Sequence, residues 1–232
     1  MPLAGLAGKG LGTMLHTLLN PGQTPLRVLC LGAHCDDIEI GCGGSLLALL
    51  ESRNDVEITW VVFASNGERR AEAQMGARLF AQGSLSLDIR ILDFRDGFLP
   101  TEPVRLKETF ESIKASTSSP DLIFTHYRQD LHQDHRAVSD LTWNTFRNNL
   151  ILEYEIPKWD GDIGQPNVFV PLAKHNGDTK IHHLQQAYRS QAEKPWFSHD
   201  LFWSLMRIRG MECNADEMIA EAFYSRKMIV AV

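Results

Sequence analysis

"LGAHCDDIEIGCGG", residues 31–44, places a histidine, a cysteine and two adjacent aspartates directly after an apolar run. The run begins at Leu26 as "LRVLCLGA" and is short, rich in branched residues and almost continuously apolar. Such a run is typical of a strand covered on both faces. Ionisable side chains therefore stand where a buried strand ends. We interpret the glycines that follow, Gly41, Gly43 and Gly44, as a tight turn into a helix, because their spacing does not match the dinucleotide fingerprint.

Strands and helices alternate through the first two-thirds of the chain. Three more apolar runs of the same kind are "VEITWVVFAS" (56–65), "DIRILDF" (88–94) and "DLIFTH" (121–126). The segments with helical spacing are 44–53, 68–82, 104–117 and 134–148. Alternation at this pitch implies parallel strands joined by crossover helices. The sequence therefore predicts an α/β fold, a Rossmann-like and mostly parallel sheet with helices on both faces.

The chain is expected to form one domain over residues 1–232, with the sheet core at about 26–150. Compact α/β units often reach this size as one piece. After residue 150 the pattern loosens, in a stretch rich in Pro, Gly and Asp. We interpret residues 151–232 as a C-terminal elaboration packed on the sheet. Its predicted helices lie near 179–192, 199–210 and 214–224.

Composition excludes several classes of protein. A net charge of −6 argues against a protein whose main role is to bind nucleic acid or an anionic membrane. No apolar stretch approaches the ~18 residues of a membrane-spanning helix, and the stretch "MPLAGLAGKGLGTMLHTLLNPG" has only one lysine and several glycines, unlike a signal peptide. Four cysteines in a chain of this size favour reduced thiols in the cytoplasm.

Two polar clusters follow the first and fourth predicted strands. Ligands of an open parallel sheet bind beyond the carboxyl ends of its strands, so these clusters should face one crevice. His34 and Asp37 come from the first cluster and His135 comes from "YRQDLHQDHRAV" in the second. Two imidazoles and one carboxylate suit Zn²⁺, and catalytic zinc sites commonly keep three protein ligands and an open position for water. Such a water has its pKa lowered to about 7.

The remaining members of the clusters suit proton transfer. Asp36 cannot easily share a coordination shell with its neighbour Asp37, so it is the candidate general base. His132 lies three residues before His135, where it could hydrogen-bond a developing oxyanion or protonate a leaving amine. Asp134 could orient the His132 imidazole and hold it protonated. Together these residues predict metal-assisted hydrolysis of an amide.

The stretch "GAHCDDIEIGCGG" resembles the signature of the PIG-L/LmbE family of zinc-dependent de-N-acetylases, and "HQDH" is similar to the family's second metal motif. "SNGERRAEA", "GARLF", "YRSQ" and "MIAEAF" resemble further family segments. The resemblance implies a Rossmann-like fold that removes acetyl groups from N-acetylglucosamine units of varied conjugates.

By this resemblance the zinc ligands are His34, Asp37 and His135. Asp36 is then the general base, and His132 assists at the oxyanion with Asp134 behind it. A different divalent transition metal, such as Fe²⁺, is compatible with the same ligands.

Two positions depart from the family pattern. Cys35 stands where the common motif has proline, and we interpret it as a spacer. One branch of the family has a tyrosine near the position of Asp130. In this chain a tyrosine, Tyr127, lies at a different distance from the motif.

Three further residues are candidates for substrate binding. Arg69 follows the second strand and could bind a hydroxyl or an anionic group, although an ion pair with Glu72 on the helix surface fits equally well. His126 ends the fourth strand and either lines the pocket or is a structural histidine. Trp159 either stacks on a sugar ring or belongs to the core.

Other functions use the same residues. A sugar-nucleotide-binding transferase would use the carboxylates for a phosphate-bound Mg²⁺, but two imidazoles favour zinc over magnesium. A non-haem iron oxygenase would need closely spaced alternating strands, and a non-catalytic sugar-binding protein would keep an idle metal site. The leading hypothesis is a de-N-acetylase whose partner is a small molecule or glycoconjugate containing an N-acetyl amino sugar; a homo-oligomer is compatible with the sequence.

Overall fold

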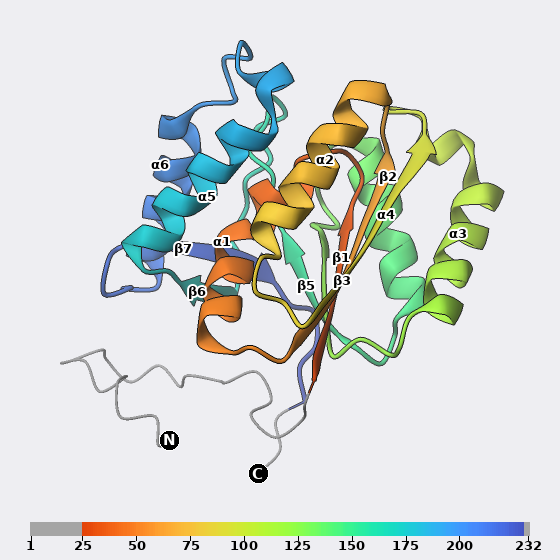
Figure 1. The fold of residues 1–232 in the computed structure, drawn as a ribbon, viewed down its shortest axis with the longest axis horizontal. Coiled ribbons are helices and arrows are strands. Elements are labelled where there is room, and N and C mark those ends of the chain that lie inside the picture. Colours follow the sequence, from red (N-terminus) through yellow and green to blue (C-terminus); the bar gives the residue numbers. More distant parts are fainter. Residues whose placement is uncertain (1–24, 230–232) are drawn as a thin grey trace.

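The computed structural model describes residues 25–229, which contain one seven-stranded sheet in the order β3-β2-β1-β4-β5-β7-β6 (Figure 1). The strands are β1 (Leu26–Gly32), β2 (Val56–Ala64), β3 (Ser86–Phe94), β4 (Leu122–His126), β5 (Leu150–Tyr154), β6 (Val168–Pro171) and β7 (Ala220–Tyr224). Strands β1 to β5 pair in parallel, whereas β7 is antiparallel to both β5 and β6. The predicted mostly parallel α/β sheet is confirmed.

Helices cover both faces of the sheet, as expected (Figure 1). One face carries α1 (Asp37–Ser52), α2 (Gly67–Phe80), α5 (Lys174–Ala187) and α6 (His199–Glu212). The other face carries α3 (Pro103–Ser116) and α4 (Gln133–Thr145). Short 3-10 turns lie at Leu99–Thr101 and Arg189–Gln191. Within residues 25–229, no helix is long and apolar enough to cross a membrane.

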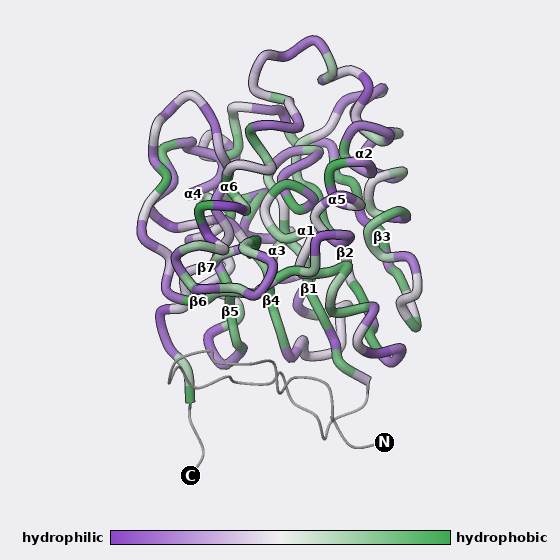
Figure 2. The backbone as a smooth tube through the Cα atoms, turned by 90° about the vertical axis from the view of Figure 1, so that its left-hand side faces the viewer, coloured by the Kyte–Doolittle hydropathy of each residue, from purple (hydrophilic) through white to green (hydrophobic). Residues whose placement is uncertain are grey.

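Two separate hydrophobic cores lie on the two faces of the sheet. Trp60 and Tyr154 are fully buried on the face of α1 and α5, and Phe63 and Phe110 stack at 5.0 Å on the face of α3. The backbone coloured by hydropathy shows β1 and β4 as hydrophobic stretches in the middle of the molecule (Figure 2). Near-continuous apolar strands follow from this burial on both sides.

The last predicted helix, 214–224, is wrong. Residues 220–224 form β7, which inserts between β5 and β6 and is buried along its whole length. Helix-compatible residues such as those of "AEAFY" adopt a strand when the sheet supplies backbone partners on both sides, because tertiary packing overrides local propensity. The sheet therefore continues beyond residue 150 into the segment predicted as an elaboration. The prediction of one domain over 1–232 extends to residues 1–24 and 230–232, which lie outside the described residues.

The glycine cluster is not a turn, because α1 begins at Asp37 and contains all three glycines. A Cβ atom on Gly41 would lie 2.2 Å from a ring carbon of Tyr154, and one on Gly43 would lie 2.5 Å from Phe80. A Cβ on Gly44 would lie 2.7 Å from Leu172. Glycine is therefore required here for the close approach of α1 to its neighbours rather than for a turn.

Buried ion pairs attach the C-terminal elements to α1. Glu221 of β7 accepts hydrogen bonds from the backbone N–H groups of Gly44 and Ser45 at 2.8 and 2.7 Å. Lys180 of α5 donates to Glu221 and to the carbonyl oxygen of Ile40, both at 2.6 Å. These paired charges fix the helix that carries the first polar cluster against β7 and α5.

We predict that Gly41→Ala lowers the free energy of unfolding by about 1–3 kcal/mol, because the added methyl overlaps the buried Tyr154 ring. Gly67→Ala is the matched control, since no atom lies within 4 Å of a Cβ at that helical position. It should leave stability unchanged or raise it by up to about 1 kcal/mol. Urea unfolding of both variants tests this; equal stabilities would contradict the packing argument.

Candidate active site

A cavity of about 680 Å³ opens at the carboxyl ends of the parallel strands. The loops that follow β1, β2, β3, β4 and β5 all contribute to its wall, and the segment before α6 adds Gln191, Lys194 and Trp196. The loop after β1 contributes His34 and Asp37, and His135 reaches it from the start of α4. The cavity thus lies where an open α/β sheet binds its ligands.

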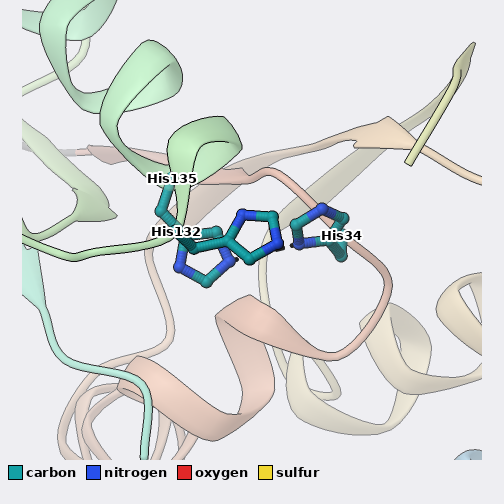
Figure 3. A group of neighbouring side chains, drawn as sticks. All are labelled: His34, His132 and His135. Carbon is teal, nitrogen blue, oxygen red and sulfur yellow. Dashed lines mark hydrogen bonds between the residues drawn. The ribbon is translucent and has the colours of Figure 1, made fainter. Parts of the chain in front are cut away.

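The pairing of β1 with β4 brings the two polar clusters together. His34 follows β1, whereas His132 and His135 stand at the N-terminus of α4, and Figure 3 shows the three imidazole rings gathered in one place. His132 is the N-cap of α4, and its Nδ1 accepts a hydrogen bond from the backbone N–H of Asp134 at 3.2 Å. The two loops predicted to meet do so.

Three atoms of the predicted metal ligands converge. His34 Nδ1 lies 3.1 Å from His135 Nε2 and 3.3 Å from Asp37 Oδ2, and His135 Nε2 lies 3.6 Å from Asp37 Oδ2. Points at these separations lie on a circle with a radius of about 1.9 Å, close to the ~2.0–2.1 Å of zinc–nitrogen bonds. A zinc ion near the centre would contact all three atoms.

Carboxylates hold the outer nitrogens of both imidazoles. His135 Nδ1 lies 2.9 Å from Asp130 Oδ2, and His34 Nε2 lies 3.1 Å from Asp96 and 3.2 Å from Asp134. A carboxylate accepts a hydrogen bond, so the protons belong on these outer nitrogens and the lone pairs of the inner nitrogens face each other. In these neutral tautomers, two lone pairs and a carboxylate oxygen at such distances repel one another unless a proton on His34 or a metal ion lies between them. The residues therefore fit a divalent metal ion.

Burial and neighbouring charge set the pKa values of the cluster. Burial lowers the pKa of His135 to about 4, so this imidazole is neutral, the form that binds metal. Burial acts to lower the pKa of His34 as well, but the carboxylates of Asp37 and Asp134 outweigh it and the pKa is raised. Burial acts to raise the pKa of Asp37, yet three surrounding imidazoles, His135 foremost, hold it well below its usual value.

Asp36 lies beside the metal-ligand cluster rather than within it. Burial raises the pKa of Asp36 to about 7, against the opposing charge of Arg69, whose Nη2 lies 2.7 Å from Asp36 Oδ2. The backbone of Asp36 has a φ of 104°, in the left-handed region that a non-glycine residue occupies at a cost. A carboxylate with a pKa near neutrality on the cavity wall suits a general base.

His126 does not line the cavity, contrary to its predicted role in substrate binding. The side chain is fully buried below the cluster, where its Nε2 accepts a hydrogen bond from Ala33 N–H at 2.9 Å and stands 3.2 Å from Asp37. Its ring stacks on His135 at 3.9 Å. Asp37, His126 and His135 also bring ligand atoms together, as do His34, His132 and His135. Because the Nε2 lone pair of His126 is used by Ala33, His126 fits a metal less well than His34 does beside Asp37 and His135.

Asp134 contacts a different histidine from the one expected. Its carboxylate lies against His34 and accepts hydrogen bonds from the backbone N–H groups of Gly97 and Leu99 at 2.7 and 3.1 Å. Only its backbone N–H reaches His132. Asp134 is fully buried, so its place is behind a predicted metal ligand rather than behind the predicted oxyanion residue.

Arg69 and Trp159 both line the cavity. Arg69 donates to Glu72 at 2.8 Å, the ion pair considered from the sequence, and also to Asp36; its contact with a substrate stays a prediction. Trp159 is 78% exposed and is therefore not a core residue. Tyr127 stacks on Tyr224 at 3.7 Å and does not line the cavity.

Cys35 behaves as a structural thiol. It is buried, its Sγ faces the carbonyl oxygen of Ala64 at 3.5 Å, and burial raises its pKa to about 12. It therefore stays protonated and fits the predicted spacer role. All four cysteines lie among the described residues and are free.

Asp130 and Lys158 were missed by the sequence reasoning. Asp130 Oδ2 accepts from His135 Nδ1 and from Lys158 Nζ, each at 2.9 Å. The sequence does contain a signal for Asp130, because a carboxylate five residues before His135 can reach the same imidazole. We compared this position only with the tyrosine of one branch of the family. Lys158 lies in the irregular segment after β5, where spacing predicts no direction for a side chain.

Residues 29–146 match the family described as GlcNAc-PI de-N-acetylase, PIG-L. The chain belongs to the PIG-L family. It is 25% identical over 147 residues to Escherichia coli (strain K12) "Uncharacterized deacetylase YaiS", covering 60% of this chain and 79% of that protein.

Two solved structures illustrate the fold of this PIG-L protein. The N,N'-diacetylchitobiose deacetylase from Pyrococcus horikoshii has a TM-score of 0.65 at 21% identity and covers 86% of this chain and 83% of that chain. GalB, the 4-carboxy-2-hydroxymuconate hydratase from Pseudomonas putida KT2440, has a TM-score of 0.68 at 15% identity and covers 89% and 98%. Identities this low show the fold alone, and one fold serves both a deacetylase and a hydratase.

We predict that Asp130→Asn weakens zinc binding by about 10–100-fold, because an amide oxygen cannot replace the carboxylate that holds His135 Nδ1. Competition with a chromophoric chelator measures the affinity. Asp93→Asn is the control, since Asp93 lines the same cavity but pairs with Arg105 instead of a histidine. Equal zinc affinities in both variants would contradict the role of Asp130.

Proposed function

We propose that this protein is a zinc-dependent hydrolase that removes the acetyl group from an N-acetylated amino sugar, of the N-acetylglucosamine type. Membership of the PIG-L family supports a hydrolytic de-N-acetylase. The observation that carries the proposal is the convergence of His34 Nδ1, Asp37 Oδ2 and His135 Nε2 within 3.6 Å of one another beside a large cavity.

His34, Asp37 and His135 would hold the zinc ion, and Fe²⁺ is compatible with the same donors. Bound zinc supplies Lewis acidity, which polarises the amide carbonyl and lowers the pKa of water to about 7. Asp130 and Asp134 orient the two imidazoles by accepting hydrogen bonds from the outer nitrogens.

Asp36 moves the proton in this scheme. Its carboxylate accepts a proton from the attacking water as the oxygen–carbon bond forms, and then delivers that proton to the amide nitrogen as the carbon–nitrogen bond breaks. The products are acetate and a free amine. Arg69 holds the carboxylate in position through Nη2.

His132 is suited to stabilise the carbonyl oxygen as negative charge develops on it. Its Nδ1 accepts from the backbone of Asp134, which leaves the proton on Nε2 as a hydrogen-bond donor. Burial and the charge of His34 lower the pKa of His132, so the imidazole donates in its neutral form. This differs from the expectation that Asp134 keeps the ring protonated.

The alternative functions are less well supported. A transferase with a phosphate-bound Mg²⁺ calls for oxygen ligands, whereas two of the three converging atoms are imidazole nitrogens. A non-catalytic protein would not need a carboxylate on the cavity wall beside those atoms, where Asp36 lies. The cytoplasmic location stays a prediction from the cysteines.

We expect Asp36→Asn to lower kcat for acetate release from N-acetylglucosamine conjugates by about 10²–10⁴-fold, because the amide cannot accept the proton. Zinc affinity should not change, since Asp36 lies outside the ligand cluster. The control is Asp200→Asn on α6, whose side chain is 98% exposed. Equal activity of the wild type and Asp36→Asn would exclude Asp36 as the general base.

Zinc should stabilise the wild type and restore activity after removal with a chelator. At zinc concentrations about 100-fold above Kd the added stability is about 2.7 kcal/mol, which a thermal melt detects. In His34→Ala both effects should be lost, because one of the three donors is missing. A zinc-dependent rise in Tm of undiminished size in His34→Ala would show that the metal binds elsewhere.

A further inference from the structure

The wall of the active-site cavity has two chemically different sides. The side after β3 is charged and polar, with Asp93, Arg95 and Asp96. The side formed by the segment after β5 and the segment before α6 carries the apolar and aromatic side chains of Ile156, Pro157, Trp159 and Trp196, together with Lys158, Gln191 and Lys194. The converging atoms of His34 and His135 lie between these sides, on the loops after β1 and β4.

Exposed apolar side chains occur on the segment after β5 and on the loop after β4. Trp159 lines the cavity and is 78% exposed, and Leu131 and Ile163 are 56% and 47% exposed. The backbone N–H of Leu131 donates to Asp162 at 2.7 Å, which places Leu131 beside the segment that carries Trp159 and Ile163. We name Leu131, Trp159 and Ile163 the apolar shelf. Exposed apolar groups that adjoin a cavity are typical of a ligand surface.

The polar groups of the apolar shelf bind one another. Lys158 Nζ donates to Asp130 at 2.9 Å and to Asp162 at 2.5 Å. The Asp162 side chain is almost buried, and the same oxygen also accepts from the backbone of Leu131. These bonds fasten the segment to the loop after β4, and they leave Lys158 and Asp162 committed to each other rather than free for a sugar hydroxyl.

We propose that the apolar shelf binds an apolar aglycone attached to the acetylated amino sugar, with Trp159 as the specificity-determining residue. The inference rests on the proposed de-N-acetylase function. The sugar occupies the polar side near Asp36, and its substituent extends over Trp159. A cavity of about 680 Å³ holds a drug-sized ligand, and a single acetylated sugar fills only part of it. Lys158 and Asp162, charged side chains on either side of Trp159 in the sequence, are already bonded to each other and would not serve the hydroxyls of a second sugar.

The test compares methyl and octyl glycosides of N-acetylglucosamine, below the micelle concentration of the octyl compound, with N,N'-diacetylchitobiose. Binding is measured by isothermal titration calorimetry and acetate release by steady-state kinetics, on zinc-loaded wild type, Trp159→Ala and Met211→Ala. Met211 on α6 is 62% exposed and outside the cavity wall, so it controls for loss of an exposed apolar side chain. Wild type and Met211→Ala should bind the octyl glycoside at least about 10-fold more tightly than the methyl glycoside, with similar kcat.

In Trp159→Ala the preference for octyl should fall to about 2-fold or less. Equal binding of octyl and methyl glycosides by the wild type, or an octyl preference that survives Trp159→Ala, would overturn the inference. Tighter binding of the disaccharide, lost in Trp159→Ala, would assign the shelf to a second sugar instead. If the protein binds the octyl glycoside more tightly but releases acetate from none of the compounds, the role of the apolar shelf is supported and the proposed function is contradicted. Failure of the inference and failure of the proposed function are therefore distinguishable.

Discussion

The convergence of two imidazole lone pairs and one carboxylate oxygen at distances of 3.1–3.6 Å is the constraint on which the rest of the site depends. Without a metal ion and without other contacts, the rings of His34 and His135 would rotate away from each other or share a proton. Carboxylates on the outer side of each ring prevent the turn, because Asp130 holds one and Asp134 holds the other. The inner arrangement is therefore set by an outer shell of buried acids, which is the usual way that proteins orient metal-binding histidines.

The sheet supplies the stiffness that this arrangement needs. β1 and β4 are adjacent central strands, so the loops that follow them leave the same edge at a fixed separation. α1 is held down on β7 by the bonds from Glu221 to backbone N–H groups of the helix, and its glycines let it approach Tyr154 closely. The strained backbone at Asp36 persists because these contacts fix the residues on both sides of it.

The sequence predicted those features that depend on periodicity and on the order of strands. Apolar runs predict the parallel core, and the rule for strand ends predicts that His34, Asp37 and His135 lie together. Side chains in loops do not point in directions that repeat along the sequence, so periodicity does not predict them. The partner of Asp134 and the burial of His126 were therefore not predictable, and β7 was mistaken for a helix because its two sheet neighbours are distant in the chain.

The metal site and the apolar shelf differ in how they tolerate change. Around the proposed metal position, Asp37, Asp130, Asp134 and His135 are buried and hydrogen-bonded, so a substitution there disturbs several bonds together. Trp159 is mostly exposed, and its backbone segment is fastened by the neighbouring Lys158 rather than by its own ring. The residue at 159 can therefore vary without moving His135, although both belong to one cavity. Under the proposed function, such a division would let one reaction serve amino sugars with different substituents, because the reacting groups lie on the sheet loops and the proposed aglycone contact lies on the segment after β5.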